Sequence, residues 1–305
     1  MTETSLKSIR HWDLYVVEQF DPRGFNRGWL FNVGLAVAVG DRRASPDVTK
    51  VSQANEPRCA TIQDIDYLPE FGVDYADCKV PMQLSSEIDR YNWKTPYMKS
   101  AGGIVGMNLE HWKQINGFGN NYFGWGGEDD ELHHRLRLNN LLYGDCYPHC
   151  SGKRDKDRSK TGIAIKRPTK GHGRFSGKYM HSANHTKRIT DSKAYQKNMK
   201  QLQEIENNNP RWKKDGLSSL AFRILSQEVD ASDKEQYGIT YHRIKVHRGK
   251  REFKLDQVGL AVPHALCRGA PADYSVWELG ASIPWDLRAL RERAEQVAKA
   301  VVQEC

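Results

Sequence analysis

The stretch AGGIVGMNLEHWKQINGFGNNYFGWGGEDDEL occupies residues 101–132 and contains several structural signals in quick succession. Residues 100–108 are largely apolar with interspersed glycines, which predicts a strand whose backbone something approaches closely. Residues 109–116 predict a short helix, and Gly117 ends it. After a glycine-rich turn, residues 128–139 return to a helical pattern of leucines. The stretch therefore predicts one strand followed by two helices.

Apolar runs on both sides of this stretch predict further elements. These are a buried strand at 13–19, a helix at 25–40 that Asn26 caps, a second strand at 59–66 that ends in acids, a polar helix at 191–207, and a closing antiparallel pair at 220–229 and 237–246. Strands that alternate with helices favour an α/β fold with a mostly parallel central sheet flanked by helices.

The chain has 305 residues and a formal net charge of +8, which fits an anionic partner or an ordinary solvated surface equally well. No DNA- or RNA-binding motif accompanies the charge, so we expect no nucleic-acid partner. No apolar run is long enough to span a bilayer, and the first residues lack the apolar segment of a signal peptide. We expect either a cytosolic protein or a chain that has lost its targeting segment.

Two segments depart from the α/β pattern. Residues 151–178 are basic, rich in glycine and poor in apolar side chains, which predicts a long mobile loop. The composition changes after about Lys250, and residues 284–303 predict an amphipathic helix. We therefore expect one main domain over residues 1–250 and a C-terminal extension over residues 251–305.

Asp64 and Asp66 follow an apolar run in the stretch IQDIDYLPE. Alternation along a strand would place both carboxylates on one face, where hard oxygen ligands suit Mn²⁺ or Mg²⁺. Such a metal can neutralise a diphosphate leaving group. A pair of acids that only caps a loop is the commoner explanation of an isolated Asp-x-Asp sequence.

The glycine-rich turn carries a tryptophan and leads into four consecutive acids. Gly124, Gly126 and Gly127 permit a tight backbone path, and Trp125 offers an apolar face of the kind that stacks on a sugar ring. The acids at 128–131 begin a helix, where the helix dipole favours negative charge, so helix stabilisation alone could explain them. A carboxylate beside a sugar-stacking tryptophan could also act as general base on a hydroxyl.

The stretch KYMHSANHTKR at residues 178–188 contains a second set of candidate ligands. His181 and His185 lie four residues apart beside Met180, and imidazole joins carboxylate in many Mn²⁺ sites. Histidines that only face solvent are the commoner alternative. The sequence Asn-His-Thr at 184–186 is an N-glycosylation acceptor, which has meaning only in a secretory compartment.

Taken together, these stretches resemble the β-1,4-galactosyltransferase family, which is glycosyltransferase family 7. The matching stretches, in the family's order, are FNRGWLFNVG at 25–34, IQDIDYLPE at 62–70, the stretch at 101–132 and DGLSSLAFRIL at 215–225. The resemblance spans roughly residues 12–246. It implies a GT-A-type catalytic domain that apparently lacks its usual first strand, a UDP-sugar donor, a Mn²⁺ ion and inversion at the anomeric carbon.

The resemblance also implies a role for each candidate residue. Asp129 matches the base that deprotonates the acceptor hydroxyl, while Glu128 and Asp130 match groups that bind or orient the acceptor. The implied metal ligands are Asp66 and His181, with Met180 or His185 as a further ligand. The residues expected to contact the donor are Phe25, Arg27, Asp64, Arg90, Gly103 and Trp125.

Further expectations follow from the same resemblance. Cys59 and Cys78 match a family disulfide, which together with the glycosylation sequence favours the Golgi lumen. Ser100 stands where galactose-transferring members carry a large aromatic residue, so we expect UDP-GalNAc to be accepted along with UDP-galactose. The acceptor would be a glycan of a glycoprotein, glycolipid or proteoglycan linker that ends in GlcNAc or xylose. An inactive relative that binds glycans or a partner stays open, and residues 251–305 could form a homo-oligomer contact.

Overall fold

The computed structural model describes residues 12–39, 59–70, 72–144, 164–177, 192–207, 209–234 and 239–249. The strands are β1 (Trp12–Gln19), β2 (Cys59–Gln63), β3 (Tyr67–Pro69), β4 (Met82–Gln83), β5 (Glu87–Ile88), β6 (Ile104–Asn108), β7 (Arg174–Gly177), β8 (Arg223–Asp230) and β9 (Ile239–His247). The α-helices are α1 (Arg27–Ala38), α2 (Leu109–Gln114), α3 (Glu128–Leu138) and α5 (Lys193–Glu206). Short 3₁₀ helices are η2 (Asp89–Tyr91), η4 (Pro210–Lys213) and η5 (Leu217–Ser219).

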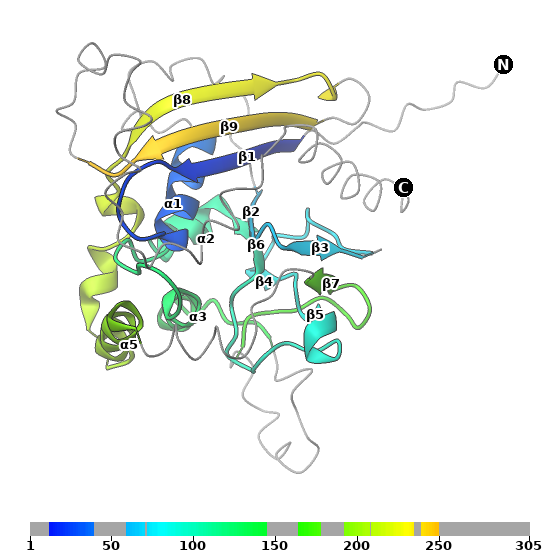
Figure 1. The fold of residues 1–305 in the computed structure, drawn as a ribbon. Coiled ribbons are helices and arrows are strands. Elements are labelled where there is room, and N and C mark those ends of the chain that lie inside the picture. The colour runs from blue at the N-terminus through cyan, green and yellow to red at the C-terminus, as the bar shows by residue number, and fades with distance from the viewer. Residues whose placement is uncertain are drawn as a thin grey trace.

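The described strands form three small sheets, in the orders β1-β9-β8, β2-β6-β4 and β3-β7-β5 (Figure 1). The mixed α/β class is therefore confirmed. The prediction of a mostly parallel sheet is wrong for the described strands, because only the β1–β9 and β5–β7 pairs are parallel. Antiparallel neighbours need no helical crossover, so the alternation of strands and helices along the chain does not by itself fix the strand directions.

Helix α1 covers one face of the first sheet (Figure 1). The side chain of Asn26 caps it, as predicted, by accepting from the Trp29 N–H at 2.8 Å. Trp29 and Val33 pack in the same buried cluster as Ile244 of β9. The strand predicted at 13–19 does form as β1, but it is not buried, because it lies at the sheet's edge. Packing against this sheet thus fixes the position of α1, whose first turn carries Arg27.

A second core lies between the sheet β2-β6-β4 and helices α2 and α3. Met107 of β6, Trp112 of α2 and Leu132 of α3 share one buried cluster, and the Trp112 indole N–H donates to the Ala60 carbonyl at 3.0 Å. The two helices predicted from the opening stretch are confirmed, at Leu109–Gln114 and Glu128–Leu138. This core fixes the start of α3 next to the glycines that precede β6.

The basic segment 151–178 was predicted to be a mobile loop, and this is wrong for the described residues 164–177. Ile165 and Phe175 are fully buried, and Phe175 belongs to β7 between β3 and β5. Arg167 donates to the Met98 carbonyl at 2.7 Å. The basic side chains thus accompany a few apolar residues that anchor the segment. Residues 151–163 and 178 lie outside the described residues.

Several expectations concern residues outside the described ranges. Met180, His181, His185 and residues 251–305 are among them, so the metal ligands, the C-terminal helix and the division into domains stay predictions. The expected disulfide is confirmed, since Cys59 and Cys78 are bonded across 19 residues. No helix in the described part of the chain combines the length and the apolar composition needed to cross a bilayer.

Candidate active site

Arg27, in the first turn of α1, joins acids from two other segments. Its Nε and Nη2 donate to the two carboxylate oxygens of Asp64 at 2.6 and 3.1 Å. Its Nη1 donates to Asp129 Oδ1 and, at 3.4 Å, to Glu128 Oε1. The guanidinium carbon also lies 4.8 Å from the centre of the Phe31 ring. The single positive charge of Arg27 thus faces the carboxylates of Asp64, Glu128 and Asp129. The cluster therefore carries more acidic groups than its one cation can neutralise.

The four consecutive acids of α3 turn to different partners. Glu128 and Asp129 face Arg27, whereas Asp130 accepts from the Tyr97 hydroxyl at 2.8 Å. Glu131 points into the core and binds Arg135 at 2.6 Å. Successive side chains leave a helix in different directions, so the acids do not all face one another. Helix stabilisation alone does not account for such specific partners.

Burial raises the pKa of three acids at this site, which are Asp64, Glu128 and Asp130. The pKa of Asp64 is raised to about 6, chiefly by desolvation, although Arg27 opposes the shift. Desolvation also raises the pKa of Glu128, and the neighbouring charge of Asp129 adds to it. Glu128 Oε2 is buried and has no hydrogen-bond partner in the described part of the chain. Such a set of acids favours a cation or a hydrogen-bond donor such as a hydroxyl.

The Glu128→Gln variant is expected to be more stable than the wild type at about pH 8. Because the folded chain raises the pKa of Glu128, it binds more protons than the unfolded chain above the usual glutamate value of about 4.3. The contribution of Glu128 to the free energy of unfolding therefore falls as the pH rises through the raised pKa. Urea unfolding at a series of pH values measures this. A variant less stable than the wild type at the alkaline end would contradict it.

Asp129 lies against the backbone of Gly102, just before β6. A Cβ atom at residue 102 would overlap the Asp129 carboxylate, so only glycine leaves room for it. Gly103 adjoins the other acid of the cluster, since its carbonyl accepts from the Asp64 N–H at 3.2 Å. Backbone on one side and Arg27 on the other therefore hold the Asp129 carboxylate in place.

The Gly102→Ala variant is expected to displace the Asp129 carboxylate and to cost about 1–3 kcal/mol of stability. Gly34→Ala is the matched control, because Gly34 lies inside α1 and a Cβ there would make only an ordinary contact with Val17 at 3.4 Å. Alanine is the better helix former, so this control should be at least as stable as the wild type. Thermal unfolding of both variants measures the difference, and equal effects would contradict the crowding at Gly102.

Asp64 and Asp66 do not alternate along a strand, which corrects the local structure predicted for them. Strand β2 ends at Gln63, and the Tyr67 N–H donates to the Asp64 carbonyl at 3.3 Å to close a turn. Asp64 binds Arg27, while Asp66 lies within the turn. No group of three His, Cys, Asp or Glu residues in the described ranges could hold a metal. Asp66 offers the hard oxygen that Mn²⁺ prefers.

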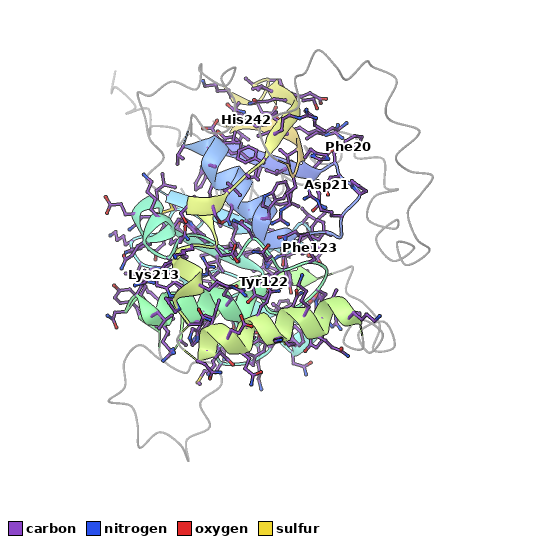
Figure 2. The ribbon with its side chains drawn as sticks, turned by 90° about the vertical axis from the view of Figure 1, so that its left-hand side faces the viewer. Phe20, Asp21, Tyr122, Phe123, Lys213 and His242 are labelled. Carbon is purple, nitrogen blue, oxygen red and sulfur yellow. A yellow bond between two sulfur atoms is a disulfide. The ribbon has the colours of Figure 1, made fainter. Side chains whose placement is uncertain are left out.

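The glycine-rich loop carries Trp125 and leads directly into Glu128 and Asp129 of this cluster. Trp125 is 41% exposed, and its indole stacks on Tyr195 of α5 with ring centres 5.8 Å apart. Gly124, Gly126 and Gly127 adopt φ values of 73°, 98° and 97°, which other residues rarely adopt. The Gly124 N–H donates to the Phe25 carbonyl at 2.7 Å. This contact joins the loop to the segment before α1, whose Gly24 also lies against Phe123; Figure 2 labels Phe20, Asp21 and Phe123 of these two segments.

The structure brings some candidate residues together and leaves others as predictions. Arg27, Asp64, Glu128 and Asp129 form one cluster, with Gly103 adjoining it. Arg90 lies over the Tyr91 ring at 5.7 Å, and its expected role beside a diphosphate stays a prediction. Sequence reasoning missed three contact residues, which are Tyr97, Gly102 and Tyr195. Their partners are distant in sequence, and the double glycine at 102–103 was the one usable signal.

Comparisons with known proteins point to one family. A family model described as the N-terminal domain of galactosyltransferase matches residues 82–181, which include the opening stretch. Rat β-1,4-galactosyltransferase 6 is 37% identical over 123 residues, covering 40% of this chain and 29% of the rat protein. Human β-1,4-galactosyltransferase 5 is 36% identical over 124 residues, with the same coverage of 40% and 29%. Over these stretches the chain is similar to the β-1,4-galactosyltransferase family.

The chain matches under a third of the length of those curated relatives. Mouse β-1,4-galactosyltransferase 4 is 27% identical over 218 residues, covering 71% of this chain and 51% of the mouse protein. A solved structure of a Drosophila β-1,4-galactosyltransferase 7 mutant with manganese, UDP-Gal and xylobiose aligns at a TM-score of 0.47 and 23% identity, covering 78% of this chain and 80% of that one. The mixed α/β class agrees with the GT-A-type fold expected of the family.

Proposed function

We propose that the chain transfers galactose, or N-acetylgalactosamine, from a UDP-sugar to a hydroxyl of a glycan acceptor, with inversion at the anomeric carbon and dependence on Mn²⁺. The observation that carries the proposal is the Asp129 carboxylate, held between Arg27 and the Gly102 backbone at the end of a loop that exposes Trp125. A fixed carboxylate beside an exposed indole suits a base that acts on a sugar hydroxyl. Relatives named β-1,4-galactosyltransferase 5 and 6 support galactose as the transferred sugar.

The proposed reaction is a single in-line displacement, which needs one base and no enzyme nucleophile. Asp129 accepts the proton of the acceptor hydroxyl while that oxygen bonds to the anomeric carbon, and the bond from that carbon to the phosphate oxygen breaks to release UDP. Glu128 and Asp130 orient the acceptor, and the exposed face of Trp125 covers the sugars. Holding the reacting groups in this geometry supplies much of the rate.

The residues proposed to hold the metal are Asp66 and His181, with Met180 or His185 completing the set. When bound, Mn²⁺ would offset the negative charge that develops on the departing diphosphate. Arg27 is proposed to keep Asp64 and Asp129 apart, since it donates to both. Phe25 and Arg90 are proposed to contact the nucleotide. The disulfide between Cys59 and Cys78 fits an oxidising compartment, in line with a place in the Golgi lumen.

Release of UDP from UDP-galactose tests the proposal. The protein is incubated with Mn²⁺ and a panel of GlcNAc- and xylose-terminated acceptors, and at least one acceptor is expected to give release above the rate of donor hydrolysis. No release with any acceptor, together with glycan binding by Asp129→Asn equal to that of the wild type, would instead favour an inactive relative that acts as a glycan-binding module.

Donor choice is proposed to depend on Ser100. This residue is 5% exposed, and Gln83 Nε2 donates to its Oγ at 3.2 Å and to the Gly102 carbonyl at 3.1 Å. A small side chain so close to Gly102 leaves room for an N-acetyl group, so the wild type is expected to use UDP-GalNAc along with UDP-galactose. Ser100→Tyr should lower the use of UDP-GalNAc more than that of UDP-galactose, while Ser100→Ala should keep both donors. Strict use of UDP-galactose by the wild type would contradict this.

A further inference from the structure

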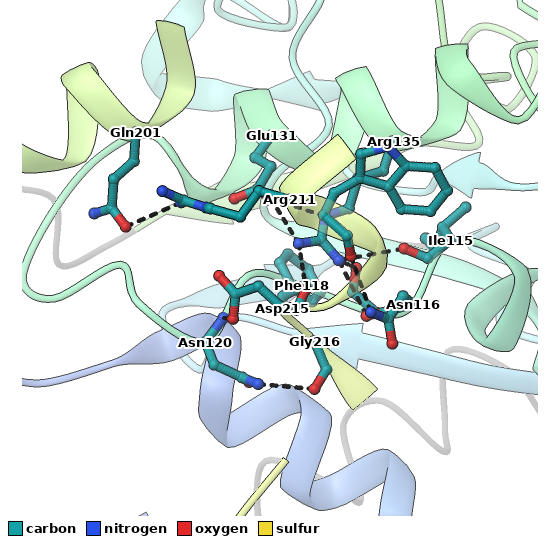
Figure 3. A network of polar contacts seen from close by, with 12 residues as sticks. Ile115, Asn116, Phe118, Asn120, Glu131, Arg135, Gln201, Arg211, Asp215 and Gly216 are labelled. Carbon is teal, nitrogen blue, oxygen red and sulfur yellow. Dashed lines mark hydrogen bonds and ion pairs between the residues drawn. The ribbon is translucent and has the colours of Figure 1, made fainter. Parts of the chain in front are cut away.

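A buried polar network centres on Asn120, which lies between α2 and the glycine-rich loop (Figure 3). Asn120 is 5% exposed. Its Nδ2 donates to the Gly216 carbonyl at 2.7 Å, and its backbone N–H donates to Asp215 Oδ1 at 3.0 Å. These contacts bind it to the segment DGLSS at residues 215–219, which matched the family without receiving a role. The network thus connects residues 215–219 to Asn120, which precedes the glycine-rich loop of the candidate site.

Asn26, the N-cap of α1, and Asn32, in the middle of α1, bind Asn120 from the other side. Asn26 Nδ2 donates to the Asn120 carbonyl at 2.9 Å, while Asn26 Oδ1 caps α1. Asn32 Nδ2 donates to Asn120 Oδ1 at 2.9 Å, and Asn32 Oδ1 accepts from the Phe118 N–H. Because Asn26 directly precedes Arg27, these hydrogen bonds fix the turn of helix that carries Arg27.

The same segment is bound to α3 through Arg135. Arg135 Nη2 donates to the Asp215 carbonyl at 2.7 Å and to Glu131 Oε1 at 2.6 Å. Both Arg135 and Glu131 are fully buried. Glu131 stands two residues after Asp129 in the first turn of α3. The network therefore runs without a break from the start of α1, through Asn120 and Asp215, to the start of α3.

We propose that Asn120 is a positioning residue for the sugar transfer, an inference that rests on the proposed function. The Arg27 side chain, at the start of α1, contacts the Asp129 side chain, at the start of α3. Asn120 is proposed to set the spacing between these two helix starts without contacting the substrate. Its amide donates and accepts in one satisfied arrangement, and a shift of either helix would leave buried polar groups unpaired. Misplacement of a base by about 1 Å can lower a rate by about 10²-fold.

The first test compares Asn120→Ala with Asn116→Gly. Asn116 is also buried and binds the same segment, since its Nδ2 donates to the Trp212 carbonyl at 2.9 Å and to Ser218 Oγ at 3.0 Å. None of its described side-chain hydrogen bonds reaches α1. Glycine is the right replacement, because Asn116 has a φ of 60°. Both variants remove buried side-chain hydrogen bonds to this segment, but only Asn120→Ala also removes a hydrogen bond to α1, the one from Asn32.

Both variants are expected to lower the temperature of unfolding. Asn120→Ala should lower kcat by about 10- to 100-fold with a much smaller change in the KM for UDP-galactose, because only the geometry of the base is disturbed. Asn116→Gly should keep the wild-type kcat. Equal losses of kcat in the two variants, or a wild-type kcat in Asn120→Ala, would overturn the proposal.

A second readout does not depend on turnover. The Nε–Hε cross-peak of Arg27 in a ¹H–¹⁵N spectrum reports its hydrogen bond to Asp64, and its loss in Arg27→Lys assigns it. The cross-peak should shift in Asn120→Ala and stay in place in Asn116→Gly. If the wild type transfers no sugar, the proposed function fails, while the cross-peak still decides whether Asn120 positions Arg27. An unmoved cross-peak in Asn120→Ala would overturn the positioning role.

Asn26→Ser covers the case in which Asn120→Ala does not fold. A serine hydroxyl can still accept from the Trp29 N–H and cap α1, but it lacks the amide that donates to the Asn120 carbonyl. This variant removes the contact to Asn120 that lies next to Arg27, while the contact from Asn32 remains, so it should lower kcat and shift the Arg27 cross-peak in the same direction. A wild-type kcat and an unmoved cross-peak in Asn26→Ser would also overturn the proposal.

Discussion

Replacing Asp129 with asparagine is expected to lower kcat for sugar transfer by about 10²- to 10⁴-fold. The amide has nearly the same shape and can still accept from Arg27 Nη1, so the cluster should stay assembled. It cannot take up the proton of the acceptor hydroxyl, which is the step assigned to this residue. The rate of UDP release with donor, Mn²⁺ and acceptor measures the loss, and circular dichroism of the variant checks that the fold is kept.

Asp130→Asn is the matched control for this variant. Asp130 is the next residue of the same helical turn, and its carboxylate accepts from the Tyr97 hydroxyl at 2.8 Å rather than from Arg27. An amide oxygen can keep that hydrogen bond, so this variant should mainly raise the KM for the acceptor. A larger loss of kcat in Asp130→Asn than in Asp129→Asn would show that the base has been assigned to the wrong acid.

Replacing Arg135 with methionine is expected to lower the free energy of unfolding by about 3–5 kcal/mol. Arg135 and Glu131 have no exposed surface, and the variant leaves a carboxylate buried without its cation. The same guanidinium donates to the carbonyls of Ile115, Asn116, Gly117 and Asp215. Urea unfolding measures the change.

The double variant Glu131→Leu with Arg135→Met separates the two roles of Arg135. A buried ion pair can often be replaced by apolar residues at little cost. Here the lost donors leave several buried carbonyls unpaired, each at about 1–3 kcal/mol, so the double variant should stay well below the wild type. Arg211→Met is the control, because its partner Glu204 is 41% exposed at the side chain and such a pair contributes about 0–1 kcal/mol. A double variant as stable as the wild type would show that only the ion pair matters.

Local signals in the sequence were enough to predict much of the fold. Asn26 predicted the start of α1, and the acids after Gly127 predicted the start of α3, because caps and first-turn charges act within a few residues. The closing pair β8 and β9 was also predicted correctly, as two apolar runs close together in the chain. In each case, the residues that determine the element lie close to it in the sequence.

Contacts between distant residues could not be predicted in the same way. Arg27 binds Asp64 and Asp129, and Asp129 is 102 residues away in the sequence. Nothing near Arg27 in the sequence indicates which acids it contacts. The burial of residues 164–177 was missed for a similar reason. Their basic composition suggested a solvated loop, whereas Ile165 and Phe175 are buried in cores built by other segments.

The stacking of Trp125 on Tyr195 makes the two faces of the indole unequal. Tyr195 covers one face, so a ring that stacks on Trp125 can approach only the other face. A small residue at position 195 would uncover the second face and let a ring bind from either side, so the sidedness of the loop depends on a residue of a different helix.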